Sequence, residues 1–478
     1  MTTAKQWLVC MAWAGLSGCN LAPVYQRPQP PVPAEFARTG PMADGLPTSS
    51  ADGKVGAELQ SWQAFVADAA MREVIVLALA HNRDLRLALA NIEQARSLYG
   101  VQRAERLPTL SGDAGMEAGR SRTGVAAGEA SAVQRTYSVD LGMAAFEIDL
   151  FGRMRNLSDA ALESFLAARE TQRAVRVSVI AETAKAYITL ATDRQRLAIA
   201  QHAAELSART LALTRSRQSN GMASGLDMRQ AEISHQQSQV DAASYATSVA
   251  RAENALRLLL GQEVPPHLRP QPLGEQAMTL IRLPASLHTE VLLERPDVRA
   301  AEHALMAQHA NIGAARAAFF PRLSLSGATG RASDDLGTLF NAGTRTWSLV
   351  PSLSLPLFDG GANRANLDYA KASREAALAT YEKTIQTAFR EVADALALNG
   401  TIEQQVQAQS RLLHAAEQAF AIAQERYRVG SDTFLNLLVS QQTLLSARSA
   451  WADLQETRQL NNVSLYRALG GGATEPQE

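Results

Sequence analysis

Residues 402–430 read IEQQVQAQSRLLHAAEQAFAIAQERYRVG, and they continue a seam of mostly apolar residues that begins at Val392. The spacing along the seam alternates between three and four residues without a break, and only Asn399 and Gln409 are polar. The seam consists of Val392, Ala395, Asn399, Ile402, Val406, Gln409, Leu413, Ala416, Phe420, Ala423 and Tyr427. This heptad pattern is typical of a coiled coil. It predicts one helix over residues 363–428, about 95 Å long.

The sequence around this seam is the second of two related halves. Matching landmarks, at an offset of 213 and then 209 residues, are Leu107-Pro108 with Phe320-Pro321, Asn220-Gly221 with Val429-Gly430, and Leu260-Gly261 with Leu469-Gly470. We therefore expect two structural repeats, residues 71–261 and 287–470, separated by a proline-rich joint over residues 262–286. A short tail, residues 471–478, follows the second repeat.

Each repeat shows the same predicted order of helix, two strands, very long helix, tight turn and helix. The strand signals are segments in which apolar and polar residues alternate, at residues 108–122, 135–150, 321–335 and 344–358. Such alternation is typical of transmembrane β-barrel strands, although a soluble hairpin fits it equally. Four strands cannot close a barrel, which needs about eight. If the strands span a membrane, the chain must therefore oligomerise, and three chains would supply twelve strands. The long helices alone would also fit a simple coiled-coil rod.

The N-terminus has the pattern of an export signal. Lys5 precedes a short apolar run, which ends in Leu16-Ser17-Gly18-Cys19 and resembles the lipobox of bacterial lipoproteins. We expect residues 1–18 to be a signal peptide and Cys19 to carry diacylglycerol and N-palmitoyl lipid. The alternative is an ordinary signal peptide with an incidental cysteine. Residues 19–70, rich in Pro, Gly, Ala and Ser from residue 20 to 60, are expected to form a tether with little structure of its own.

Composition excludes several classes of function. Lys and Arg number 46 against 47 Asp and Glu, which argues against nucleic acid as a partner. Cys10 and Cys19 are the only cysteines, so the body of the chain has no disulfide framework. The sequence contains no Walker loop, dinucleotide fingerprint or His-Glu-x-x-His motif. We expect no enzyme, no metal and no cofactor, and we expect His303 and His309 to be surface residues rather than ligands.

Several motifs resemble the outer membrane efflux protein (TolC-like) family, within it the NodT-type lipoprotein branch that serves resistance-nodulation-division pumps. They are Ala22-Pro23-x-Tyr25-x-Arg27-Pro28, Arg295-Pro296-Asp297-Val298, Leu357-Phe358-Asp359-Gly360-Gly361 and Tyr427-Arg428-Val429-Gly430. The resemblance implies a mainly α-helical homotrimer with a twelve-stranded transmembrane β-barrel and a long periplasmic α-helical barrel, whose equatorial region contains the proline-rich joint. It implies the outer membrane of a Gram-negative bacterium, a periplasmic adaptor, an inner-membrane pump, and passive export of drugs and other toxic small molecules.

The resemblance also implies a periplasmic gate near the second tight turn. The family's apolar ring falls on Leu435, and the positions where relatives have aspartates fall on Asn436 and Val439. An acidic position of the first repeat falls on Asp227. Its basic partner position holds Asp432, so the family's salt bridge cannot form, and Arg428 or Arg229 are the candidate substitutes. Helix capping and packing are the alternative roles for all of these residues.

Two other readings of the whole chain remain at this point. The same channel would serve type I protein secretion if its pump were an ATP-driven exporter. A periplasmic coiled-coil scaffold or adaptor would explain the helices, but it would not explain a pair of strands at matching places in both repeats.

Overall fold

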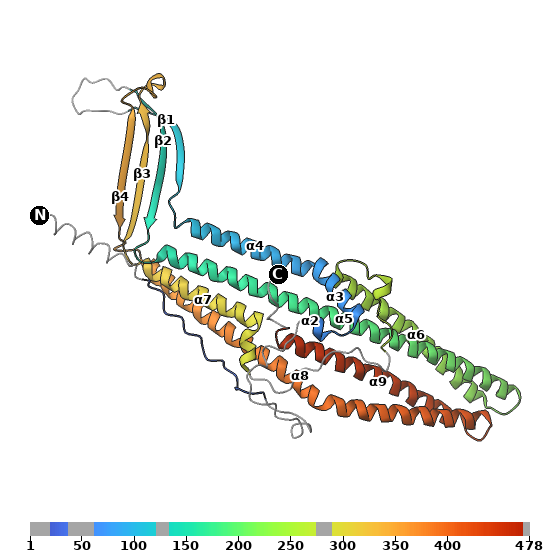
Figure 1. Cartoon of the computed structure of the whole chain (residues 1–478). Helices are drawn as coiled ribbons and strands as arrows, with labels where there is room; N and C mark the ends of the chain where they lie inside the picture. The colour runs from blue at the N-terminus through green and yellow to red at the C-terminus, as the bar shows by residue number, and fades with distance from the viewer. Residues whose placement is uncertain (1–19, 37–61, 121–132, 274–288, 472–478) are drawn as a thin grey trace. The chain divides into compact units, whose positions relative to one another are not determined.

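The computed structural model describes residues 20–36, 62–120, 133–273 and 289–471 (Figure 1). The chain divides into two compact units, each built from three separate stretches of sequence. The first contains the described parts of 1–29, 91–169 and 300–381, and the second those of 30–90, 170–299 and 382–478. Within the described residues, none of the helices combines the length and the apolarity that a bilayer crossing requires.

The first unit contains one antiparallel sheet in the order β1-β2-β3-β4. Its strands are β1 (Leu110–Arg120), β2 (Val133–Ile148), β3 (Arg322–Ser333) and β4 (Arg345–Ser354). All four lie where the alternating pattern predicts them, with ends that differ by no more than four residues. The strands of the two repeats therefore pair into a single sheet, in which β2 meets β3.

The register gives this sheet one apolar and one polar face. Leu141 pairs with Gly112 on β1 and with Thr329 on β3, so alternate residues of neighbouring strands share a face. The apolar face includes Leu110, Met116, Leu141, Trp347, Leu349 and Leu353, each more than half exposed. The opposite face includes Asp113, Glu117, Asp140, Ser348 and Ser352. Among the residues that the structure describes, no layer covers this apolar face.

Two long helical hairpins dominate the rest of the chain. The first joins α5 (Arg153–Ser219) to α6 (Gly225–Leu260), and the second joins α8 (Ala362–Arg428) to α9 (Phe434–Ala468). The heptad seam predicted a helix over 363–428, and α8 confirms it to within one residue. Asp359 fixes the start of α8, because its carboxylate accepts hydrogen bonds from the backbone N–H groups of Gly361 and Asn363.

The repeats differ at their first helix. The second repeat has a single helix, α7 (Pro296–Ala317), whereas the first has α3 (Ala69–His81) followed by α4 (Arg83–Ala104). Asn82 separates α3 from α4: its side-chain amide donates to the carbonyl of Leu259 at 3.0 Å, and its oxygen accepts from Leu85 N at 3.0 Å. These contacts hold an extended backbone at Asn82 and end α3 there.

The core of the second unit corrects the expectation of a tether over 19–70. Residues Trp62–Phe65 form a short helix, α2, and both aromatic ends of it are buried. The Phe65 ring stacks on Tyr466 at 4.4 Å between centroids. Burial of two large aromatic side chains favours folding by several kcal/mol, on the order of 1.5–3 kcal/mol each. The segment next to α3 is therefore part of the core.

Residues 20–36 are extended, as expected, but they are held by specific contacts. In the first unit, Arg27 donates two hydrogen bonds of 2.7 Å to the two carboxylate oxygens of Glu302, and the Tyr25 hydroxyl donates to the same carboxylate at 3.0 Å. In the second unit, Phe36 stacks on Phe389 at 4.8 Å. We call residues 20–29 the N-terminal arm.

Two histidines expected at the surface are partly buried. His303 Nδ1 lies 2.7 Å from a carboxylate oxygen of Glu163, at 24% exposure of the histidine side chain. His309 packs edge-on against the ring of Tyr25 at 5.4 Å. Burial lowers the pKa of His309, which favours its neutral form. Neither position belongs to a metal-ligand cluster among the residues with a described placement.

The Arg-Pro-Asp-Val motif, residues 295–298, connects separate segments of the second unit. Arg295 is buried, and it donates to the carbonyl of Ala468 at the end of α9 as well as to Asp297 and Glu391. Gly470 follows with a positive φ of 90°, and an added Cβ there would lie 3.4 Å from the Arg295 side chain. The motif thus ties the start of the second repeat to its end.

Candidate functional site at the two hairpin tips

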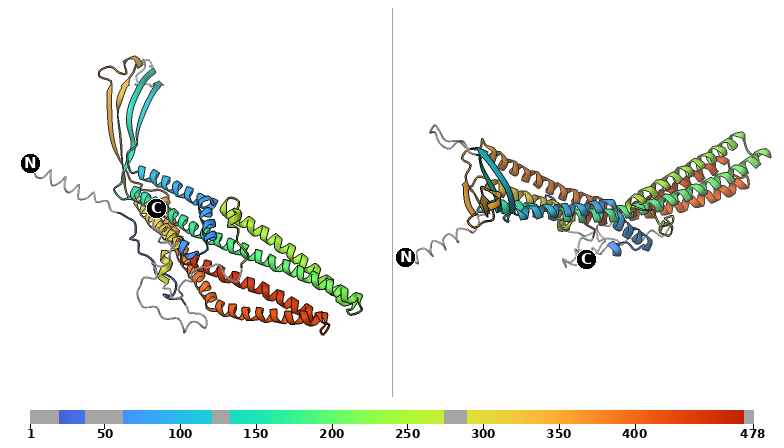
Figure 2. Two further views of the ribbon diagram at one scale, coloured as in Figure 1. Left: turned by 45° about the vertical axis from the view of Figure 1, so that its right-hand side comes forward. Right: turned by 90° about the horizontal axis from the view of Figure 1, so that it is seen from above.

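The two helical hairpins end in turns of the same design. Both turns lie at the same end of the second unit in each view of Figure 2. Gly221 and Gly430 adopt positive φ angles of 73° and 85°, which glycine tolerates best. Met222 N donates to Arg217 O at 2.8 Å, and Ser431 N donates to Arg426 O at 2.9 Å. Glycine therefore sits where each long helix must end.

The helices after the turns begin with different caps. In the first tip, Ser224 accepts from Asp227 N at 3.1 Å, and the Asp227 carboxylate accepts from Ser224 N at 2.9 Å. This is a capping box, which stabilises the start of α6. In the second tip, Thr433 accepts from Asn436 N, but the Asn436 amide donates to Asp432 at 2.6 Å instead of closing a box.

Among the described residues of one chain, neither Arg229 nor Arg428 pairs with a carboxylate of the other hairpin. Arg229 pairs with Glu232 at 2.8 Å, and Arg428 pairs with Glu425 at 2.6 Å, in each case three residues away on the same helix. Asp432 pairs with Arg426 at 3.2 Å. The pKa of the Asp432 carboxyl is lowered, mainly because its carboxylate accepts a hydrogen bond from Asn436. The capping role that we weighed for Asp227 is present.

Leu435 and Val439 are exposed apolar residues in the first two turns of α9. They lie one turn apart on α9 and are 57% and 52% exposed in the single chain. Phe434 and Leu437 point to the other side and are buried in the hydrophobic cluster of the tips. Leu435 and Val439 thus form an exposed apolar stripe beside the packed face of α9. Side chains that form a ring around a pore must be exposed in the single chain in this way.

Arg217 joins the two tips, and the sequence did not single it out. Its guanidinium lies 4.7 Å from the centroid of the Tyr427 ring, and its Nη1 donates to the Tyr427 carbonyl at 2.5 Å. The Tyr427 hydroxyl shares a 3.0 Å hydrogen bond with the hydroxyl of Thr214. We call these contacts of Arg217 and Thr214 with Tyr427 the tip latch.

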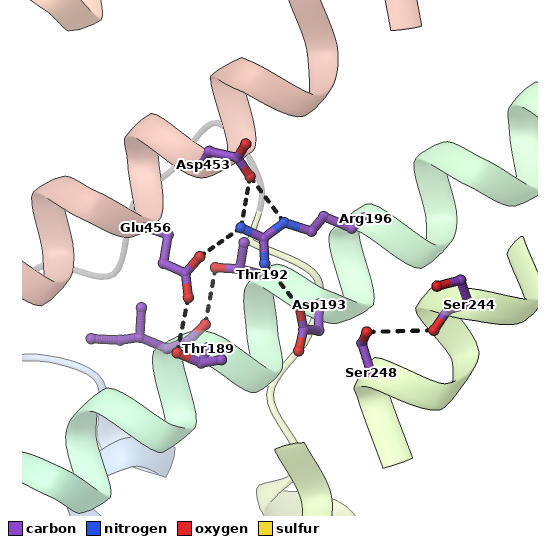
Figure 3. Close-up of polar contacts among 9 residues, drawn as sticks. Thr189, Thr192, Asp193, Arg196, Ser244, Ser248, Asp453 and Glu456 are labelled. Carbon is purple, nitrogen blue, oxygen red and sulfur yellow. Dashed lines mark hydrogen bonds and ion pairs between the residues drawn. The ribbon is translucent and has the colours of Figure 1, made fainter. Parts of the chain in front are cut away.

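A second charged cluster fixes α5 to α9 farther from the tips (Figure 3). Arg196 contacts Asp453 at 2.6 Å and Glu456 at 2.7 Å on α9, and Asp193 at 2.8 Å on its own helix. Thr189 donates to the other oxygen of Glu456 at 2.9 Å. Burial alone would lower the pKa of Arg196. The three carboxylates raise it by more, so the pKa lies above its ordinary value and the guanidinium stays charged.

Comparison with known proteins places this architecture in one family. The outer membrane efflux protein model matches residues 74–262 and 287–471. The solvent efflux pump outer membrane protein SrpC of Pseudomonas putida is 42% identical over 458 residues, which is 96% of each protein. The outer membrane protein OprJ of Pseudomonas aeruginosa is 39% identical over 460 residues, 96% of this chain and 94% of OprJ.

A solved structure agrees with these relatives. The open state of the MtrE outer membrane channel of Neisseria gonorrhoeae superimposes with a TM-score of 0.82 at 35% identity, covering 95% of this chain and 99% of MtrE. The chain belongs to the outer membrane efflux protein family, which confirms the resemblance predicted from its motifs. It is an outer membrane efflux channel that extends into the periplasm.

Proposed function

We propose that three copies of the chain form one channel-tunnel, in which their sheets close a twelve-stranded transmembrane barrel. In the described part of one chain, β1 and β4 are the edge strands of the sheet, and each pairs with a single neighbouring strand. Open strand edges are strongly disfavoured in lipid, because their N–H and C=O groups lack partners. Three amphipathic four-stranded sheets would satisfy every edge, with the polar faces around a lumen. The observation that carries this proposal is the exposed apolar face of a sheet with two open edges.

The trimer would act as the passive exit duct of a tripartite pump. Its partners would be a periplasmic adaptor and an inner-membrane resistance-nodulation-division pump, and its cargo would be drugs, solvents and other toxic small molecules. SrpC is named as a solvent efflux component, which supports this class of cargo. The family's members are channels, and transport energy would come from the pump.

Photo-crosslinking from a hairpin tip tests the assembly in living cells. A photoreactive residue replaces Met222, which is 61% exposed at the first tip, and a control carries it at Val24, 85% exposed in the N-terminal arm. We expect the tip variant to capture the adaptor and its pump, identified by mass spectrometry, and the control to capture neither. Capture of an ATP-driven exporter instead would assign the channel to polypeptide secretion, and capture of neither partner would contradict the tripartite assembly.

We also propose that Cys19 is the acylated N-terminus of the mature protein. Cys19 and the signal peptide, residues 1–18, lie outside the described residues, as do residues 472–478 of the tail and 274–288 around the joint. The proposal is supported by the lipobox-like sequence and by the arm, which begins at the next residue. Mass spectrometry of the mature N-terminal peptide should find diacylglycerol and palmitoyl groups, and an unmodified cysteine would contradict it.

We also propose that Leu435, with Asn436 and Val439, forms the periplasmic gate of the channel, and this proposal predicts a leak from Leu435→Ala. If three Leu435 side chains meet in the closed pore, their truncation removes apolar contact from the closed state. A net loss of about 1.4 kcal/mol is enough to shift the closed-to-open ratio about tenfold. The matched control is Leu226→Ala, because Leu226 occupies the equivalent position of the first tip and is 66% exposed. Single-channel conductance and sensitivity to large antibiotics are the measurements. Equal behaviour of the two variants would remove Leu435 from the gate.

A further inference from the structure

The end of α7 and the start of α8 border a shallow cavity of about 430 Å³ in the first unit. Its apolar lining comes from Leu21, Phe319, Phe320 and Leu367. Phe320 is held in place by stacking on Phe151 at 4.7 Å, and the Asn363 amide donates to Ala318 O at 3.3 Å, which fastens the start of α8 to the end of α7. The floor of the cavity is therefore fixed by two helices and the arm.

The rim of this cavity is positively charged. It consists of Arg316, Arg364 and Lys371, and all three residues are exposed. The carboxylate of Asp368 lies 3.3 Å from Arg364 Nε and 3.5 Å from Lys371 Nζ, so two of the three cationic side chains share one carboxylate. Among the described residues Arg316 has no carboxylate partner, and it donates to the carbonyl of Leu21 at 3.0 Å. The rim keeps an excess of two positive charges beside an apolar floor.

Apart from Leu21, the residues that line the cavity lie close in sequence to the ends of α7, β3 and β4 and to the start of α8. Phe320 stands two residues before β3, and α8 starts eight residues after β4 ends. Between β4 and α8, Leu357 and Phe358 are 90% and 92% exposed. Leu21 follows Cys19 by two residues. Aromatic and apolar groups combined with arginine and lysine are typical of the level where a protein leaves the bilayer.

We propose that this cavity binds the headgroup of an anionic phospholipid in the periplasmic leaflet of the outer membrane. The phosphate would lie among Arg316, Arg364 and Lys371, and an acyl chain would lie against Phe319 and Leu367. Basic pockets at the membrane surface favour anionic headgroups in this way. The proposal rests on the proposed function in one respect, because it takes the strands to be membrane-spanning. It adds a lipid site that is separate from the acyl chains expected on Cys19.

Native mass spectrometry of the full-length trimer with added lipid tests the proposal. Phosphatidylglycerol and phosphatidylcholine with identical acyl chains are titrated, and bound lipid per trimer is counted. We expect the wild type to favour phosphatidylglycerol. We expect the double variant Arg316→Gln with Arg364→Gln to lose about tenfold or more of that preference, since each cation near a membrane surface contributes about a factor of five.

The chain offers a matched control for Arg364. Arg155 is likewise the third residue of its long helix, and its Asp159 partner is also four residues ahead, at 3.8 Å, but it does not line the cavity. Arg155→Gln should leave the lipid preference unchanged. An equal loss from Arg155→Gln, or no preference in the wild type, would overturn the proposal. Displacement of phosphatidylglycerol by free glycerol 3-phosphate would reassign the cavity to soluble phosphates.

These outcomes are distinguishable from a failure of the proposed function. Conductance in planar bilayers is measured on the same preparations. Channels with normal conductance but no preference for anionic lipid would contradict the lipid site and leave the proposed channel function intact. A protein that forms no channel in any bilayer would instead contradict the proposed membrane-spanning assembly, on which the lipid site depends.

Discussion

Replacing Arg217 with alanine is expected to weaken the contact between the two hairpin tips and to favour the open channel. Arg217 lies on α5, and its guanidinium both stacks over the Tyr427 ring at 4.7 Å and donates to the Tyr427 carbonyl. A hydrogen bond from a charged donor contributes about 1.5–3 kcal/mol and a cation–π contact about 1 kcal/mol. A loss of about 3 kcal/mol corresponds to a shift of about a hundredfold in the closed-to-open ratio.

A matched control for this variant exists in the second repeat. Arg426 stands 209 residues after Arg217, at the same distance before its turn glycine, but it pairs with Asp432 within its own hairpin. Arg426→Ala should therefore loosen one turn and leave the tips joined. Single-channel conductance in planar bilayers and sensitivity to vancomycin in cells are the two measurements. The tip latch has no gating role if Arg217→Ala and Arg426→Ala conduct alike.

Tyr427→Phe separates the two parts of the tip latch. It removes the hydrogen bond between the Tyr427 hydroxyl and Thr214, but it keeps the ring under the guanidinium and the backbone carbonyl. We expect an effect of about 1 kcal/mol, close to one hydrogen bond. A Tyr427→Phe variant as open as Arg217→Ala would show that the hydroxyl, not the guanidinium, joins the tips.

The long-range plan of the chain was predictable because it rests on periodic patterns. The heptad seam defined α8 to within one residue, and alternation located all four strands, since coiled-coil and sheet periods are properties of neighbouring residues. The turn glycines Gly221 and Gly430 were identified by the repeat itself. These signals are local, so a single sequence carries them.

The partners of individual charges were not predictable in the same way. Arg217 and Arg426 occupy equivalent positions, yet one contacts the other hairpin and one contacts its own turn. Arg229 and Arg428 each bind a carboxylate three residues away on the same helix, a local pairing that needs no partner on the other hairpin. Glu302 resembles any helical surface residue, although its partners lie more than 270 residues away.

Arg27→Met is expected to detach the N-terminal arm and to destabilise the first unit. The Glu302 side chain is only 5% exposed, whereas that of Arg27 is 50% exposed. Removing one partner of a buried ion pair costs about 3–5 kcal/mol, because the remaining charge stays desolvated. We expect the lower end, about 3 kcal/mol, since Arg27 is half exposed and Tyr25 continues to donate to Glu302. Thermal unfolding of the detergent-purified protein measures this loss.

A double variant, Arg27→Met with Glu302→Gln, distinguishes the effect of an unpaired buried carboxylate from a general loss of packing. Adding Glu302→Gln to Arg27→Met removes the unpaired carboxylate, and the glutamine oxygen still accepts from Tyr25. The double variant should therefore recover most of the lost stability, while Tyr25→Phe alone should cost about 1 kcal/mol. Limited proteolysis should cut the arm readily in Arg27→Met and slowly in the double variant. If both variants are equally unstable and equally cut, Arg27 acts through its packing, and the carboxylate of Glu302 does not anchor the arm.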